Sequence, residues 1–147
     1  YLSRMSEHFR RLERMYASAP INEFFAPRLQ IPEAGVAELR MTIRPDFHHA
    51  AHAAHGAVYF KALDDATFFA ANSIVEDVFV LTVSFNLYLT RPVSEGEVIA
   101  RGRVVSRSKR LYLADGTLED ARGREIARGS GAFMPSTVAL TDDIGYR

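Results

Sequence analysis

The sequence has 147 residues, 48% of them apolar, which is enough to bury the core of one domain. Its 18 basic and 18 acidic residues cancel, and this balance argues against nucleic acid as the main partner because phosphate binding needs a basic excess. The sequence lacks cysteine, which excludes disulfides, thiolate zinc sites and a cysteine nucleophile. With no membrane-length apolar run and no visible signal peptide, we expect a cytoplasmic protein without a membrane partner.

Two elements are predicted before residue 45. Residues 2–18 should form an amphipathic helix, because Met5, Phe9, Leu12 and Met15/Tyr16 recur at helical spacing between charged residues. We expect this helix to cover a sheet face and to end before Pro20. Residues 27–44 should form a hairpin whose strands, 27–31 and 36–43, flank a turn of proline, glutamate, alanine and glycine.

A histidine-rich loop at residues 48–55 precedes a predicted helix at 56–72. The helical segment is rich in alanine and phenylalanine, has no interior glycine or proline, and is apolar almost all round. Such a pattern is typical of a buried helix.

From Val78 the apolar period changes to two residues, which indicates a strand. The alternation assigns two faces: Leu81, Val83, Phe85, Leu87 and Leu89 against Thr82, Ser84, Asn86, Tyr88 and Thr90. Strands at 97–107, 111–118 and 125–134, separated by short turns, suggest an antiparallel meander. The fold class is therefore α+β, with one long helix against a curved sheet of five or six strands. We expect a single domain over residues 1–147, with residues 1–20 as an N-terminal helical extension.

Asp64 is the leading candidate for acid–base chemistry. The helical period puts it on one side with a largely apolar set: Ala57, Phe60, Thr67, Phe68 and Ala71. Desolvation there would raise the pKa of its carboxyl and make it a better proton acceptor, although the pattern fits a structural buried acid equally well. Asp65, with Lys61 one turn earlier, is expected to be an ion-paired acid on a wetter side of the helix.

The start of this helix is a candidate site for a carbonyl group. Free backbone N–H groups and the helix dipole favour negative charge there, and Gly56 lets a ligand approach the backbone closely. An acyl carbonyl at this position would be polarised and its tetrahedral oxyanion stabilised. Phe60 and Phe68 suggest an apolar tunnel, although core packing explains them as easily.

Other site types are weakly supported. His48, His49, His52 and His55 could converge on a metal, but the H-E-x-x-H signature of zinc hydrolases is missing, and we expect neither a metal nor a cofactor. No G-x-S-x-G elbow or phosphate-binding glycine loop occurs. The basic pair Lys109 and Arg110, in a tight turn, is the best local candidate for binding phosphate.

The run His55-Gly56-Ala57, followed by Leu63-Asp64-Asp65-Ala66, resembles the H-G-G…L-x-D-x-A signature of hotdog-fold acyl-CoA thioesterases, in the phenylacetate-pathway (4-hydroxybenzoyl-CoA thioesterase-like) branch. The strand at 81–92 and the segments 96–97 and 123–129 resemble later strands of that family, so the resemblance spans about residues 25–135.

This resemblance implies a central helix wrapped by an antiparallel sheet in a homodimer, often a homotetramer, with the site at the dimer interface. Asp64 would be the catalytic base or nucleophile, the Gly56 N–H would polarise the thioester carbonyl, and Thr82 would hold the attacking water. The sequence departs from the family at His49, where asparagine is usual, and at Ala57, where a second glycine is usual. His49 would still orient substrate, and His55 would brace the loop.

We therefore predict an enzyme that hydrolyses an acyl-CoA thioester to a free acid and CoA. Besides the catalytic group, we expect substrate contacts from six residues: Ala57, Phe60, Phe68, Asn86, Lys109 and Arg110. The alternative is a non-catalytic module that binds acyl-CoA or another small ligand on the same fold, and the changes at His49 and Ala57 motivate it. A hotdog dehydratase is a weaker third possibility, because no matching motif is present.

Overall fold

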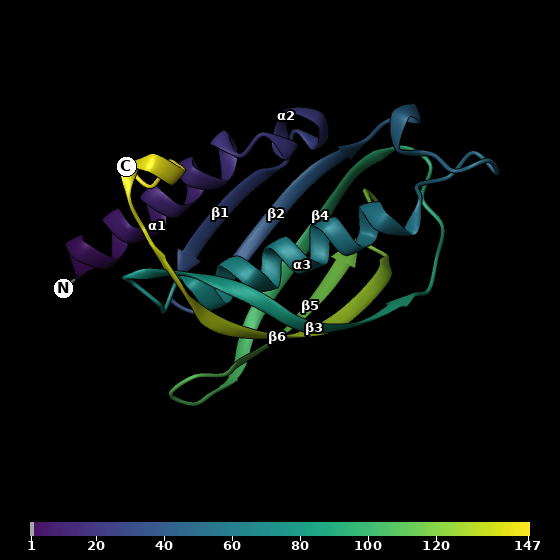
Figure 1. Ribbon diagram of the computed structural model, residues 1–147. Coiled ribbons are helices and arrows are strands. Elements are labelled where there is room, and N and C mark those ends of the chain that lie inside the picture. The colour runs from purple at the N-terminus through teal and green to yellow at the C-terminus, as the bar shows by residue number, and fades with distance from the viewer. Residues whose placement is uncertain (1) are drawn as a thin grey trace.

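The computed structural model describes residues 2–147 as one long helix laid against a six-stranded antiparallel sheet (Figure 1). The helices are α1 (Leu2–Ser18), α2 (Ile21–Phe25) and α3 (Gly56–Asn72), with 3-10 turns η1 (Pro45–Phe47) and η2 (Asp142–Ile144). The strands are β1 (Arg28–Glu33), β2 (Val36–Ile43), β3 (Val78–Leu89), β4 (Gly96–Arg107), β5 (Tyr112–Glu119) and β6 (Glu125–Ala139). The α+β class and the sheet of up to six strands are confirmed.

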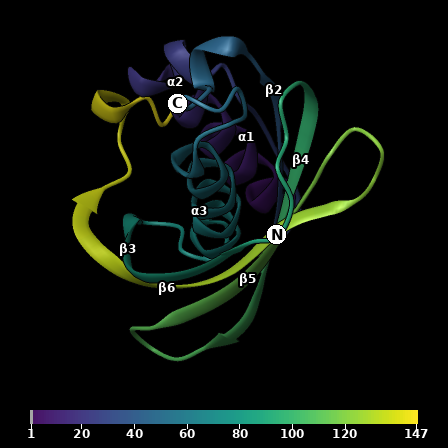
Figure 2. The ribbon, with the colours of Figure 1, turned by 90° about the vertical axis from the view of Figure 1, so that its right-hand side faces the viewer.

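The sheet has the strand order β1-β2-β4-β5-β6-β3 and curves around α3 (Figure 2). Strands β4, β5 and β6 form the predicted meander. Strand β3 does not lie beside β4, its successor in sequence, but pairs with β6 at the far edge. The 12-residue β3 is therefore an edge strand, paired on one side only within the described part of the chain.

Helix α3 is buried because small residues meet where it crosses the sheet. Ala62, Leu63 and Ala66 have no solvent exposure. On the sheet side, a Cβ atom added to Gly102 of β4 would lie 2.5 Å from the carbonyl oxygen of Ala66, so only glycine permits this approach. The predicted bounds of the helix, 56–72, are confirmed.

Helix α1 packs on the protein through the stripe that its period predicts: Met5, Phe9, Leu12, Met15 and Tyr16 are all buried. The helix ends at Ser18, as expected ahead of Pro20. Pro20 is also the N-cap of α2, a short helix that the sequence analysis missed. Two predicted strand ends were too early, because β1 runs through Pro32 and β6 through Pro135.

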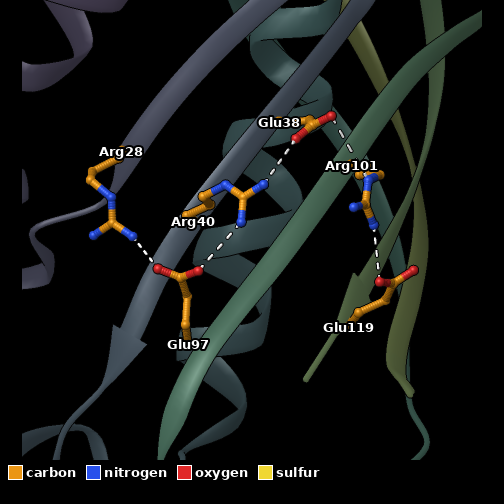
Figure 3. Close-up of polar contacts among 6 residues, drawn as sticks. All are labelled: Arg28, Glu38, Arg40, Glu97, Arg101 and Glu119. Carbon is orange, nitrogen blue, oxygen red and sulfur yellow. Dashed lines mark hydrogen bonds and ion pairs between the residues drawn. The ribbon is translucent and has the colours of Figure 1, made fainter. Parts of the chain in front are cut away.

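The outer face of the sheet carries a balanced set of charges. Three arginines and three glutamates from β1, β2, β4 and β5 form a chain of ion pairs (Figure 3): Arg28–Glu97, Arg40–Glu97, Arg40–Glu38, Arg101–Glu38 and Arg101–Glu119. Each of these three arginines has an acidic partner, so this ion-paired set carries no net charge. No helix in the described region is long and apolar enough to cross a membrane.

Candidate active site

The start of α3 leaves one backbone donor free. His55 is the N-cap, and its Nδ1 accepts a hydrogen bond of 2.9 Å from the N–H of Ala57. The N–H of Gly56, the first helical residue, has no acceptor among residues 2–147. The preceding loop is held by the His55 N–H, which donates to the carbonyl of Phe47 at 2.9 Å. A donor is thus fixed at the positive end of the helix dipole and is open to a ligand.

Asp64 lies two turns further along α3 and faces strand β3. The hydroxyl of Thr82 donates a hydrogen bond of 2.8 Å to Asp64 Oδ1, whereas Oδ2 accepts none among the described residues. The sequence left open whether the face of β3 that carries Thr82 meets Asp64, and the structure brings the two side chains together.

A β-bulge explains why the strict alternation predicted for β3 is wrong. Thr82 faces Asp64, and Phe85, three residues later, also faces α3, where its ring meets that of Phe60 edge-on at 5.5 Å. An odd spacing puts two residues of a regular strand on opposite faces. The register of β3 against β6 shifts between Thr82 and Ser84, and this extra residue reverses the phase.

Burial sets the protonation behaviour of Asp64. Desolvation raises the pKa of its carboxyl to about 6, the hydrogen bond from Thr82 and the charge of Lys61 act to lower that pKa, and the charge of Asp65 raises it further. A carboxylate in this range is ionised at neutral pH and is a stronger base than an ordinary aspartate.

Asp65 has a different environment. Its Oδ2 forms a 2.7 Å ion pair with Lys61 Nζ and accepts a 2.6 Å hydrogen bond from the hydroxyl of Tyr16 on α1. The ion pair with Lys61 is confirmed, but its expected position on a wetter side of the helix is wrong. The side chains of Lys61 and Asp65 are only 11% and 15% exposed, because α1 covers them. Burial raises the pKa of Asp65.

The two phenylalanines predicted to line a tunnel differ in their position relative to the cavity beside Asp64. Phe68, together with Phe69, Phe79 and Leu81, lines a cavity of about 760 Å³ that also touches Asp64. Phe60 lies outside this cavity, and its side chain is 41% exposed. Tyr16, Leu81 and the C-terminal segment also line the cavity, and the sequence analysis missed them. The helical period of residues 2–18 identified Tyr16 only as a packing residue. No pattern in the sequence near the C-terminus indicates that this segment lies beside α3.

Three of the four loop histidines engage separate partners through their side chains. His48 Nε2 contacts the carbonyl of Ser94 at 2.8 Å, His49 Nδ1 accepts from the N–H of Ala51 at 3.0 Å, and His55 caps α3. His52 has a left-handed backbone, with φ of 64°, in the same loop. In the described region, no group of three or more potential ligands converges on a metal site.

Three other candidates lie away from the Asp64–Thr82 pair. Asn86 is exposed and follows Phe85, which faces α3, so it points to the opposite face of β3. Lys109 and Arg110 are exposed in the turn between β4 and β5. Strand pairing aligns Tyr112, just after this turn, with Phe133 and Thr82. Tyr112 is thus two strands from Thr82, roughly 10 Å at 4.8 Å per strand, and the turn lies beyond it.

Comparison with known proteins identifies the family. A family model described as the thioesterase superfamily matches residues 51–127, which include α3, Asp64 and Thr82. Because the match covers more than half of the sequence, the chain belongs to the thioesterase superfamily. This membership supports thioester hydrolysis as the general class of activity, and the family expected from residues 55–66 is confirmed.

Solved structures agree on the fold. The E. coli protein PaaI, from the phenylacetic acid degradation operon, has a TM-score of 0.83 at 17% identity, covering 92% of this chain and 98% of that chain. A thioesterase family protein from Silicibacter pomeroyi has a TM-score of 0.79 at 26% identity, covering 86% and 96%. A curated protein of Saccharolobus solfataricus, named provisionally as an esterase, is 24% identical over 102 residues, 69% of this chain and 68% of the relative. The hotdog fold is therefore confirmed.

Proposed function

We propose that the protein hydrolyses an acyl-CoA thioester to a free acid and CoA, with Asp64 as the base or nucleophile. The observation that carries this proposal is the Asp64 carboxylate itself. Its pKa is raised to about 6 by burial, its Oδ2 is unpartnered within residues 2–147, and it lies in the wall of a largely apolar cavity. Asp65 differs, because its Oδ2 is held by both the ammonium of Lys61 and the hydroxyl of Tyr16, whereas Asp64 is held by one hydroxyl and by no cation.

The chemistry follows from two groups. As a base, Asp64 takes a proton from water, and the resulting hydroxide attacks the thioester carbonyl; as a nucleophile, its carboxylate attacks directly and water then cleaves the mixed anhydride. In both routes the free N–H of Gly56 donates to the oxyanion of the tetrahedral intermediate. The intermediate collapses when the C–S bond breaks and the CoA thiolate leaves. Thr82 holds Asp64 in place and orients the water.

Asp64 and Gly56 of one chain do not serve the same carbonyl. They are eight residues apart on α3, which is about 12 Å at 1.5 Å per residue. A carbonyl oxygen within about 3 Å of the Gly56 N–H is then too far from Asp64 for attack. We infer that each site takes Asp64 from one protomer and Gly56 from another, so the active form is a homodimer.

The edge strand β3 is the surface that supports this homodimer. It carries Thr82, and its side chains Leu81, Val83, Tyr88 and Leu89 are each more than half exposed. A long, apolar, unpaired edge invites another strand. Pairing of two β3 edges would cover these residues and bring two copies of α3 towards each other.

The remaining candidates take supporting roles. His55 fixes the start of α3 by accepting from Ala57, and His49 stabilises the loop through Ala51. Lys109 and Arg110 lie in the turn just before Tyr112, the residue that strand pairing aligns with Thr82. Their cations have no acidic partner within residues 2–147, so they are available to CoA phosphates. The departures at His49 and Ala57 motivate the non-catalytic alternative, although the hydrogen bond accepted by His49 Nδ1 leaves Nε2–H as a donor for substrate.

The test is thiol release from a panel of short, long and aromatic acyl-CoAs. Asp64→Asn should lose roughly 10²–10⁴-fold in kcat, the usual contribution of a general base. Gly56→Pro removes the N–H and adds the proline ring, which the helix accepts because proline is favoured at the first helical position and His55 already has the extended ψ of 148° that proline requires before it. Gly56→Ala keeps the N–H and is the matched control.

Mixing the two inactive variants tests the shared site. A mixed dimer of Asp64→Asn and Gly56→Pro protomers has one intact site of two, so random exchange should restore about a quarter of the normal activity. No restoration, despite subunit exchange, would contradict the shared site. Full turnover by Asp64→Asn would contradict the mechanism, and tight acyl-CoA binding without thiol release would favour the binding module.

A further inference from the structure

The cavity beside Asp64 has a wall that the catalytic proposal does not use. Its floor is α3, with Asp64 and Phe68, and β3 closes one side with Phe79 and Leu81. The rings of Phe68 and Phe79 pack at 5.0 Å. Residues 15–22, at the end of α1 and the start of α2, form a further part of the lining. The remaining wall is the C-terminal segment, residues 141–147, which contributes Asp142, Asp143, Ile144, Gly145 and Arg147.

The C-terminal segment makes the mouth of the cavity acidic. Asp142 and Asp143 are exposed, and they line the same cavity as Asp64 and Asp65. The cations in the lining are Lys61, which is paired with Asp65, and Arg147. An uncharged acyl group meets mainly apolar side chains here, whereas a carboxylated one meets like charges in a partly desolvated space.

Specific contacts hold this wall against α1. His8, which is buried on α1, contacts the hydroxyl of Tyr146 at 2.7 Å through Nδ1 and the carbonyl of Asn72 at 3.0 Å through Nε2. Arg14 Nε donates to the carbonyl of Arg147 at 2.5 Å.

Gly145 passes so close to α1 that a Cβ atom there would collide with Ser18 Oγ. Its φ of 92° is one that other residues rarely adopt. The segment is therefore positioned by the fold and is not a loose tail.

We propose that residues 141–147 are the specificity-determining wall of the site, which admits uncharged apolar acyl groups and rejects acyl groups that end in a carboxylate. This inference rests on the proposed function, because it assigns the acyl group of the same thioester to this cavity. The volume of about 760 Å³ suits a bulky acyl group rather than acetyl. Each further methylene that the cavity buries should raise kcat/KM roughly fourfold, since burial contributes about 0.8 kcal/mol per methylene.

The first test compares pentanoyl-CoA with glutaryl-CoA, which has a five-carbon acyl chain ending in a carboxylate. The intact protein should favour pentanoyl-CoA in kcat/KM. The double variant Asp142→Asn/Asp143→Asn should raise the glutaryl-to-pentanoyl ratio roughly tenfold, because it removes the repulsion and keeps the wall. The control Asp115→Asn removes one negative charge on β5, away from the cavity, and should leave the ratio unchanged.

The second test moves the wall. Gly145→Val is strained at positive φ, and its Cβ would lie 2.4 Å from Ser18 Oγ, which can rotate, and 3.4 Å from the Cα atom of Met15, which cannot. Because valine branches beyond that Cβ, it should push the segment off α1 and extend activity to longer acyl chains. The matched control is Gly123→Val, in the turn before β6, where φ is also positive (77°) but no atom lies within 4 Å of the new Cβ. Only the Gly145 variant should change the chain-length profile.

The outcomes separate the two proposals. If no acyl-CoA is hydrolysed, the catalytic proposal fails, and the wall is then tested by calorimetry with the thioethers S-pentyl-CoA and S-(4-carboxybutyl)-CoA. A preference for the uncharged thioether that Asp142→Asn/Asp143→Asn removes would still support the wall. Equal treatment of charged and uncharged acyl groups by the intact protein, or ratios unchanged by both wall variants, would overturn it.

Discussion

Asp64 and Asp65 are adjacent on α3, and burial raises the pKa of both, yet they face different parts of the molecule. Asp65 faces α1, where Lys61 and Tyr16 satisfy one carboxylate oxygen with a cation and a hydroxyl. Asp64 faces the edge strand β3, where its partner is the hydroxyl of Thr82. A rotation of about 100° along the helix thus separates an acid that holds two helices together from one that is available for chemistry.

The largest expected effect is on the α1 side. Asp65→Asn leaves the ammonium of Lys61 buried without its counter-charge, and breaking a buried pair in this way costs about 3–5 kcal/mol. The free energy of unfolding in urea at pH 7.5 should fall by up to that amount, because removing the Asp65 carboxylate also removes its own desolvation cost, which raises its pKa. Because Asp65 is not proposed to act on the substrate, the folded variant should lose far less activity than Asp64→Asn.

A double variant separates charge from packing. Lys61→Met/Asp65→Leu replaces both charges with apolar groups of similar size, which is often nearly neutral for a buried pair. It should recover most of the stability that Asp65→Asn loses. If Asp65→Asn were as stable as the unmodified protein, the contrast between the two acids would lose its basis.

The two acids also show what the sequence could predict. The bounds of α3, the apolar face with Asp64 and the ion pair of Lys61 with Asp65 depend on residues within one helix, so their spacing was informative. The burial of Asp65 was not predicted, because Tyr16 reaches it from 49 residues earlier. The contact between Thr82 and Asp64 depends on a bulge in the pairing of β3 with β6. The register between two strands cannot be predicted from the apolar period of either strand.

The next effect is on stability at the Asp64 side. The folded-state pKa of Asp64, about 6, is above its usual value of 3.8, so the folded protein binds the proton more tightly than the unfolded chain does. Its contribution to stability is present below pH 3.8 and is lost as the pH rises through 6. Above pH 6 the ionised carboxylate opposes folding.

Asp64→Asn should therefore be more stable than the unmodified protein at pH 8, by about 1–3 kcal/mol. The upper figure converts the full pKa difference into free energy at about 1.4 kcal/mol per unit. The lower figure allows for the partial solvation of Asp64, which weakens the effect of its charge. The gain should shrink between pH 6 and pH 4 in urea unfolding followed at several pH values. An equal gain at pH 4 and pH 8 would mean that packing, not charge, distinguishes the two side chains.

The smallest effect concerns Thr82, which moderates Asp64. Its hydrogen bond acts to lower the pKa of Asp64, so removing the hydroxyl in Thr82→Val should raise that pKa and move the acidic limb of kcat/KM to higher pH. At pH 6 we expect a loss of roughly 3–10-fold, equivalent to one hydrogen bond of about 0.5–1.5 kcal/mol, and a smaller loss at pH 8. Thr82→Ser keeps the hydroxyl and should keep the limb in place. If valine lowers kcat/KM equally at both pH values, Thr82 acts on the position of water or substrate rather than on the basicity of Asp64.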